Sequence, residues 1–225
     1  TKRNQPEAVH KIMQDDASRM DYDWTMTKNN SPEAMDAFFN ARADGYDAHM
    51  AHSLYDADTY YRTLTQPLPR TQSPLEVLVL GCGTGLEIPA LLERAPNARL
   101  TCIDLSAEML RILKKKFPEE NMAVIQGSYL THDFGAARCD AVLSSMTLHH
   151  LLPDRKAALY AKLFKTLKPG GRYLEGDYMV STEKMDRLLA EYRSLSDEVR
   201  GGTHHIDIPL SLAVQTNLLK KAGFD

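Results

Sequence analysis

Glycines at alternate positions follow a short apolar run near the middle of the chain. Gly81, Gly83 and Gly85 come directly after the run Glu76–Leu80. Glycines permit a tight turn and a close approach of the backbone to a ligand, and a helix starting behind them offers free N–H groups to a negative group. The dinucleotide fingerprint needs a glycine where Leu86 stands. The turn therefore predicts a ligand site other than a pyrophosphate cradle, with a purely structural turn as the alternative.

A carboxylate ends the next apolar run. Asp104 can accept hydrogen bonds from both hydroxyls of a ribose, or it can act with Ser106 as a helix cap. The glycine turn and Asp104 both follow strand-like runs, and the carboxyl ends of neighbouring parallel strands form the ligand-binding edge of an open α/β sheet. Together they predict a nucleoside-type ligand at that edge.

Apolar runs alternate with amphipathic segments over the middle of the chain. The predicted strands are 76–80, 99–103, 124–125, 141–143 and 172–174, and the predicted helices there are 86–94, 106–117 and 159–167. Continuous apolarity indicates strands buried on both faces, and the alternation indicates βαβ units with right-handed crossovers. We expect an α/β fold with a Rossmann-like, doubly wound, mostly parallel sheet and helices on both faces.

The residues before this sheet are polar, contain scattered aromatic residues and carry few strand signals. Ser31-Pro32-Glu33 predicts a helix start, and a second helix is expected over residues 46–64. We expect residues 1–72 to form an N-terminal helical cap or lid. Residues 73–225 are then the core, which forms a single structural unit with the cap and ends in helices from about Thr182 and after Pro209.

The composition excludes several classes of protein. The 225 residues are 43% hydrophobic and 25% charged, as in ordinary globular domains. A net charge of −3 disfavours a duplex-binding protein, and the run Lys114–Lys116 is expected to be a solvated helix face. The three cysteines lack a Cys-x-x-Cys spacing, which favours buried thiols in a cytoplasmic protein. No apolar run reaches the roughly 20 residues that span a bilayer, so we expect no membrane insertion.

Five sequence blocks carry a resemblance to a known family. They are Leu80–Gly85, Ile103–Ser106, Gln126–Ser128, Asp140–Leu151 and Leu167–Gly171. In this order and spacing the chain resembles a class I S-adenosylmethionine-dependent methyltransferase of the small-molecule type, similar to the ubiquinone/menaquinone-biosynthesis group. The resemblance implies methyl transfer from S-adenosylmethionine to a small-molecule acceptor by in-line displacement, with S-adenosylhomocysteine as the product.

The resemblance also implies the cofactor contacts. The glycine turn would follow the methionine part, Asp104 would bind the ribose and Leu105 would flank the adenine, whose end residues 126–129 would form. Backbone groups of Ser144 and Ser145 would lie beneath the methionine and the sulfonium. The segment 39–47 resembles the family's cofactor-covering segment, so Tyr46 would cover the methionine end. Ser128 stands where the family usually has Asp, which puts its contact with the adenine amino group in question. The full set is Tyr46, Gly81, Cys82, Gly83, Thr84, Gly85, Asp104, Leu105, Gly127, Ser128, Tyr129, Ser144 and Ser145.

Histidines mark the predicted acceptor end. His149 and His150 follow the fourth strand, and a histidine there can take a proton near neutral pH. Both are candidate catalytic residues, with packing within the fold as the alternative. His204, His205 and Asp207 form a second polar cluster, which we expect to fix a loop rather than to line the acceptor pocket. A metal site would need more ligands in suitable geometry, and we predict none.

Other functions remain as alternatives. An NAD-dependent oxidoreductase shares the strand, glycine and aspartate pattern but fails at Leu86. A tRNA-modifying methyltransferase is disfavoured by the charge, and a non-catalytic cofactor-binding protein could use the same fold. The family normally follows a segment like Ala222-Gly223-Phe224 with two antiparallel edge strands. We expect these C-terminal strands to be missing from this chain and the native protein to be longer. The acceptor and the oligomeric state are not encoded in a readable way.

Overall fold

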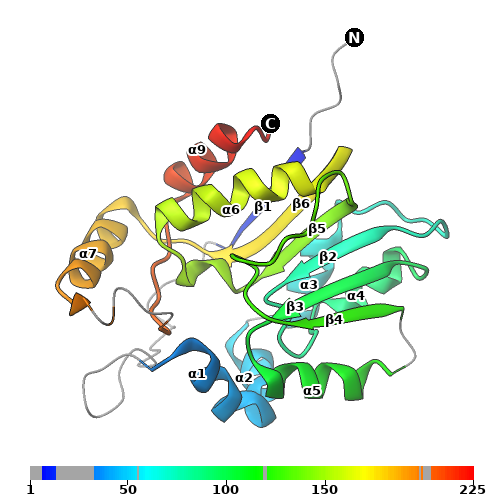
Figure 1. Cartoon of the computed structure of the whole chain (residues 1–225), viewed down its shortest axis with the longest axis horizontal. Helices are drawn as coiled ribbons and strands as arrows, with labels where there is room; N and C mark the ends of the chain where they lie inside the picture. Colours follow the sequence, from blue (N-terminus) through cyan, green and yellow to red (C-terminus); the bar gives the residue numbers. More distant parts are fainter. Residues whose placement is uncertain (1–6, 14–32, 55, 119–120, 198, 200–203) are drawn as a thin grey trace.

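Six parallel strands form one sheet (Figure 1). The computed structural model describes residues 7–13, 33–54, 56–118, 121–197, 199 and 204–225. The strands are β1 (Glu7–Met13), β2 (Glu76–Leu80), β3 (Arg99–Asp104), β4 (Met122–Gln126), β5 (Cys139–Ser145) and β6 (Leu167–Tyr178). Their order is β1-β6-β5-β2-β3-β4, and all pairings are parallel. The order reverses between β2 and β5, which confirms the doubly wound architecture and sets the switch point at which such sheets bind ligands.

Helices cover both faces of this sheet (Figure 1). The helices of the core are α4 (Ile88–Arg94), α5 (Ala107–Lys116), α6 (Pro153–Thr166), α7 (Thr182–Arg193) and α9 (Leu212–Ala222), with the 3₁₀ turn η2 (Leu148–His150) after β5. Helices α4 and α5 pack on one face, through Leu91 and Leu113. Helices α6 and α9 pack on the other, through Leu163 and Leu219. The expected α/β fold, with helices on both faces of a parallel sheet, is confirmed.

The residues of β2 show why the strand sits at the centre of the sheet. Val77 and Val79 face the cluster under α4 and α5, whereas Leu78 and Leu80 face the cluster under α6 and α9. All four are at most 2% exposed. Because successive side chains of a strand point to opposite faces, an unbroken apolar run suits a strand covered on both sides. Burying each such side chain contributes about 1.5–3 kcal/mol.

The N-terminal segment differs from the expected helical cap. Strand β1 pairs in parallel with β6 along its whole length, from Glu7 opposite Arg172 to Met13 opposite Tyr178. This strand occupies the outer edge of β6, where the resemblance predicted an antiparallel C-terminal hairpin. Its sequence alternates weakly, and the pairing depends on the ladder of β6, which no local pattern reveals. The predicted helix start at Ser31-Pro32 lies outside the described residues.

The cap itself consists of short helices. They are α1 (Met35–Arg42), the 3₁₀ turn η1 (Ala43–Gly45), α2 (Tyr46–Ser53) and α3 (Ala57–Thr65). The helical stretch expected over residues 46–64 is therefore divided into two helices. Leu54 is extended, and the Asp56 side chain accepts a hydrogen bond from the Thr59 N–H at 3.0 Å. This N-cap begins a new helix in a new direction.

Polar contacts tie the cap to the carboxyl edge of the sheet. Lys116 on α5 pairs with Asp47 on α2 at 2.7 Å, and the Thr84 hydroxyl donates to the same carboxylate. The Ser106 hydroxyl, at the start of α5, donates to the Asn40 side-chain oxygen on α1 at 2.7 Å. The cap is therefore attached to both the glycine turn and α5. The predicted solvated lysine run, Lys114–Lys116, is exposed as expected.

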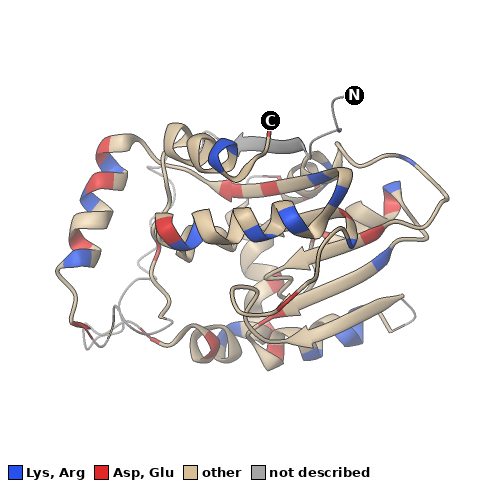
Figure 2. Cartoon of the chain, turned by 45° about the horizontal axis from the view of Figure 1, so that its top comes forward, with Lys and Arg blue, Asp and Glu red and all other residues tan. Residues whose placement is uncertain are grey.

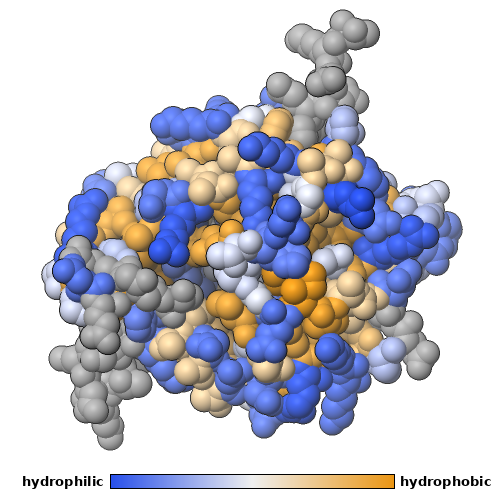
Figure 3. Space-filling model, in the orientation of Figure 1, coloured by the Kyte–Doolittle hydropathy of each residue, from blue (hydrophilic) through white to orange (hydrophobic). Residues whose placement is uncertain are grey.

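The surface carries mixed charge. Lys and Arg are interspersed with Asp and Glu on the helices in Figure 2, and most of the face in Figure 3 is hydrophilic with apolar side chains between. Among the described residues, no helix is both long and apolar enough to cross a bilayer.

Candidate functional site

A pocket lies between the cap and the carboxyl ends of β2 and β3. It is lined by Met35, Phe39, Tyr46, Gly81, Gly83, Asp104, Leu105, Met109, Ser128, Tyr129, Leu130, Met146, Thr147, His150 and Leu151. These residues come from the glycine turn, from the ends of β3 and β4, from the segment after β5 and from the cap. The pocket thus sits at the switch point of the sheet, as predicted from the placement of the turn and Asp104.

The glycine turn exposes backbone to this pocket. Gly81 and Gly83 have φ values of +55° and +48°, which side chains rarely adopt. A Cβ at Gly83 would meet only Tyr46, at 3.9 Å, so this part of the turn is open toward the pocket. Gly85 has a different task, because a Cβ there would lie 2.4 Å from the Leu113 side chain. Two glycines therefore shape the site, and the third permits α5 to pack closely.

Asp104 is held at the pocket by the backbone around it. Its carboxylate accepts hydrogen bonds from the N–H of Ser106 at 2.8 Å and the N–H of Gly83 at 2.9 Å. Burial raises the pKa of Asp104, although these N–H donors act in the opposite direction. The carboxylate thus joins the end of β3 to the glycine turn while it lines the pocket. That position suits the predicted bond to ribose hydroxyls.

Aromatic side chains of the cap form the cover. The Tyr46 and Phe39 rings lie edge to face with centroids 6.3 Å apart, and both line the pocket. Burial raises the pKa of the Tyr46 hydroxyl well above its ordinary value, so this phenol stays protonated. The cover supplies apolar surface over the glycine turn, consistent with the predicted position of Tyr46.

The structure divides the predicted cofactor residues into two groups. Those that line the pocket are Tyr46, Gly81, Gly83, Asp104, Leu105, Ser128 and Tyr129, together with His150 from the acceptor end. Those that do not are Cys82, Thr84, Gly85, Gly127, Ser144 and Ser145. Ser144 is buried with its hydroxyl 2.9 Å from the Tyr173 hydroxyl, and the Ser145 hydroxyl lies 3.2 Å from that of Tyr60. These contacts engage the two serine side chains, whereas the expected cofactor contacts are those of the backbone.

Several pocket residues were not predicted. They are Met35, Met109, Leu130, Met146, Thr147 and Leu151, whereas Phe39 belongs to the segment expected to cover the cofactor. Met109 lies within α5, and the cap residues meet the sheet only through tertiary packing. Met146 is marked by its backbone conformation, which the sequence does not show. Its φ of +48° is rare for a residue with a side chain of this size.

His149 is held in place by Asp177 at the end of β6. The imidazole Nδ1 lies 2.6 Å from one Asp177 oxygen, and the other oxygen accepts the backbone N–H groups of Leu148 and His149, both at 2.9 Å. Burial by itself would lower the pKa of His149, but the Asp177 carboxylate outweighs it and raises the pKa. His149 is buried and does not line the pocket, whereas its neighbour His150 does.

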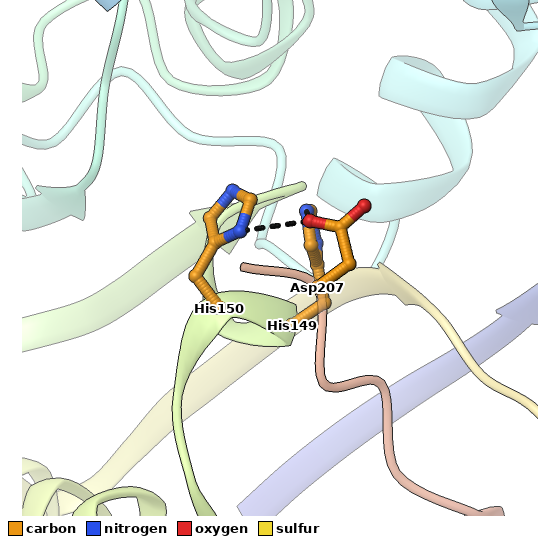
Figure 4. Close-up of side chains that lie close together, drawn as sticks. All are labelled: His149, His150 and Asp207. Carbon is orange, nitrogen blue, oxygen red and sulfur yellow. Dashed lines mark ion pairs between the residues drawn. The ribbon is translucent and has the colours of Figure 1, made fainter. Parts of the chain in front are cut away.

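His150 belongs to both the pocket and a second cluster (Figure 4). Its Nδ1 lies 3.0 Å from Asp207 Oδ1, and the other ring nitrogen points away from that carboxylate. Burial lowers the pKa of His150, and it also lowers the pKa of His205 to about 3. The His205 ring stacks on Phe38 of the cap at 3.6 Å. The segment 205–207 thus packs against η2, whereas His204 bonds the Val199 carbonyl instead.

One further buried acid stands just behind the glycine turn. Glu87, at the start of α4, is 4% exposed. Burial raises its pKa to about 7, and the nearby Asp104 carboxylate adds to the rise. The sequence analysis did not single out this residue. The sequence feature that could have identified Glu87 is its position as a charged residue between an apolar turn and an apolar helix.

An open parallel sheet with a pocket at its switch point, a glycine turn and an acid after the second core strand defines a nucleoside-binding α/β protein. Residues 77–171 match the family described as a methyltransferase domain. The chain is 32% identical over 157 residues to demethylmenaquinone methyltransferase of Lactococcus lactis, a match covering 68% of this chain and 61% of that protein. It is 29% identical over 145 residues to malonyl-[acyl-carrier protein] O-methyltransferase of Priestia megaterium, covering 60% of this chain and 48% of that protein.

Solved structures agree on the fold. The structure of DhpI with SAH superposes with a TM-score of 0.60 at 24% identity, covering 83% of this chain and 84% of DhpI. Residues 77–171 thus match a methyltransferase domain, and the chain is similar to methyltransferases in its sequence and in its fold. This disfavours the oxidoreductase alternative. The chain spans about half to three-fifths of the length of these two curated relatives.

Proposed function

We propose that this chain transfers a methyl group from S-adenosylmethionine to a small organic acceptor. The observation that carries the proposal is the pocket at the switch point, in which the open glycine turn, Asp104 and the aromatic cover surround one space. Asp104 binds the ribose hydroxyls, the backbone at Gly81 and Gly83 follows the methionine part, and Tyr46 covers it. Tyr129 and Ser128 lie at the adenine end.

The acceptor enters on the side of His150. In the reaction, a nucleophilic atom of the acceptor attacks the methyl carbon, the carbon–sulfur bond breaks and S-adenosylhomocysteine leaves. The main work of the protein is to hold the two reactants in line and away from water, an effect worth up to about 7–11 kcal/mol. His150 is the catalytic residue that touches the acceptor. His149 is a positioning residue, because Asp177 occupies its Nδ1.

A screen that follows S-adenosylhomocysteine by mass spectrometry tests this function. The purified protein is mixed with S-adenosylmethionine and separate groups of phenols, carboxylic acids, amines and thiols. We expect release with one group, a raised KM for the cofactor in Asp104→Ala and a lowered kcat with unchanged cofactor affinity in His150→Ala. Release only in a parallel assay with tRNA in place of these compounds would favour an RNA substrate. Cofactor binding without any release would favour a non-catalytic protein.

The cysteines bear on the cellular compartment in which the protein works. Cys82, Cys102 and Cys139 are free and buried, which fits a reducing compartment. We therefore propose a cytoplasmic location. A split-reporter fusion of the native gene would test it, and a signal from an oxidising compartment would contradict it.

A further inference from the structure

Three metal-ligand side chains, His149, His150 and Asp207, converge beside the acceptor end of the pocket (Figure 4), and His205 lies next to them. They come from two segments far apart in the sequence, the turn η2 and the segment before α9. The common point is Asp207 Oδ1. It lies 3.0 Å from His150 Nδ1, 3.8 Å from His149 Nε2 and 3.9 Å from His205 Nε2.

The Asp207 oxygen at the centre of this cluster has no well-aligned hydrogen bond. Oδ1 is buried and has no hydrogen-bond partner of good geometry among the described residues, although it forms an ion pair with His150 Nδ1 at 3.0 Å. The same His150 nitrogen lies 3.4 Å from the Ile206 carbonyl oxygen. A buried acceptor atom without a well-aligned donor calls for an explanation, and a bound ion is one such explanation. Three imidazole nitrogens around one carboxylate oxygen are also a poor arrangement for hydrogen bonding alone.

The distances fit a transition-metal ion better. Zinc binds nitrogen and oxygen ligands at about 2.0–2.2 Å, so ligand atoms at tetrahedral angles lie about 3.3 Å apart. The three distances to Oδ1 bracket this value. The ligand atoms of His149, His150 and Asp207 all lie within 4.8 Å of one another.

The surroundings already orient the ligands. Asp177 holds His149 by Nδ1, which leaves Nε2 facing Asp207. A carboxylate behind a histidine in this way is the usual outer partner of a metal ligand. Phe38 stacks parallel to the His205 ring, at an angle of 6°, and fixes its plane. The Asp207 side chain is 26% exposed, so an ion can reach the cluster.

We propose that His149, His150, His205 and Asp207 bind one divalent transition-metal ion of the zinc type. Imidazole nitrogens with a carboxylate oxygen suit zinc among such ions. The ion bridges η2 to the segment 205–207 and so builds one wall of the acceptor end. With Nδ1 on the metal, the other nitrogen of His150 carries a proton and faces the acceptor as a donor. Only this link to the acceptor rests on the proposed function; the metal site itself does not.

Metal titration of the purified chain tests the site directly. The protein is treated with a chelator, desalted and titrated with Zn²⁺ by calorimetry and with Co²⁺ by visible absorption. We expect one ion per chain, a Co²⁺ spectrum of the intense tetrahedral type and a higher melting temperature with Zn²⁺. Asp207→Asn and His205→Phe, which keeps an aromatic ring against Phe38, should each weaken binding at least tenfold.

Two comparisons make the outcome decisive. Asp177→Asn should weaken Zn²⁺ binding by about 10–100-fold, as for other outer partners. His52→Ala, an exposed histidine on α2, should leave binding unchanged. Absence of Zn²⁺ binding, or binding that is unaffected in both Asp207→Asn and His205→Phe, would overturn the proposal. S-adenosylhomocysteine binding, measured on the same samples, shows whether the metal site or the proposed function has failed.

Discussion

The buried carboxyl of Glu87 makes stability depend on pH in a defined direction. Its pKa in the folded chain is about 7, against 4.5 for an ordinary glutamate. A raised carboxyl pKa stabilises the fold fully at low pH, and that contribution is lost as pH rises from 4.5 through 7. The shift of about 2.5 units, at 1.36 kcal/mol per unit, corresponds to about 3 kcal/mol lost by pH 8 and roughly 1 kcal/mol lost at pH 5.

The substitution Glu87→Gln removes the ionisation while it keeps the shape. We expect the variant to gain about 3 kcal/mol over the parent at pH 8, but only about 1 kcal/mol at pH 5. For a domain of this size the gain at pH 8 is about 6–12 °C in melting temperature. Thermal and urea unfolding at both pH values measure it. Glu191→Gln, with a side chain 65% exposed on α7, is the matched control. An equal effect of Glu87→Gln at both pH values would refute the reasoning.

Three further substitutions probe the site. Gly83→Ala should lose about 1–2 kcal/mol of stability, because its backbone is left-handed, and should bind S-adenosylhomocysteine more weakly. Gly45→Ala is the control, since a Cβ there meets open space, and it should change neither quantity. Equal effects of the two substitutions would argue against a special role of the glycine turn. Tyr46→Ala should weaken cofactor binding and turnover more than Tyr46→Phe does. Unchanged cofactor affinity and turnover in both variants would contradict the proposal that Tyr46 covers the cofactor. Asp177→Asn should lower the free energy of unfolding by about 3–5 kcal/mol, because it breaks a buried pair with His149; a loss below 1 kcal/mol in urea would contradict this.

The core could be predicted because its signals are local. The run Glu76–Leu80 is apolar at every position but the first, and Ser106 caps α5 through the Met109 N–H, as its type indicates. The N-terminal zone had no such signals. Strand β1 is specified by pairing with β6, and the break between α2 and α3 depends on one capping side chain, Asp56. Edge pairing and tertiary packing do not leave a periodic pattern.

The site divides in the same way. The glycine turn and Asp104 were predicted, since a tight turn and a strand end restrict both the residue type and its place. The convergence of Asp207 with His150 could not be, because 57 positions of chain separate them and only the packing of the last segment on η2 joins them. The sequence analysis therefore placed His150 and Asp207 in two separate clusters and expected the cluster with Asp207 to fix a loop.

Cofactor binding tests the central claim most directly. Isothermal titration of the purified chain with S-adenosylmethionine, and separately with S-adenosylhomocysteine, measures affinity and stoichiometry. We predict one site per chain for both ligands and at least tenfold weaker binding of both in Asp104→Ala, with Gly45→Ala unchanged. If neither ligand binds the parent chain, or if Asp104→Ala binds as tightly as the parent, the assignment of this pocket to S-adenosylmethionine is wrong.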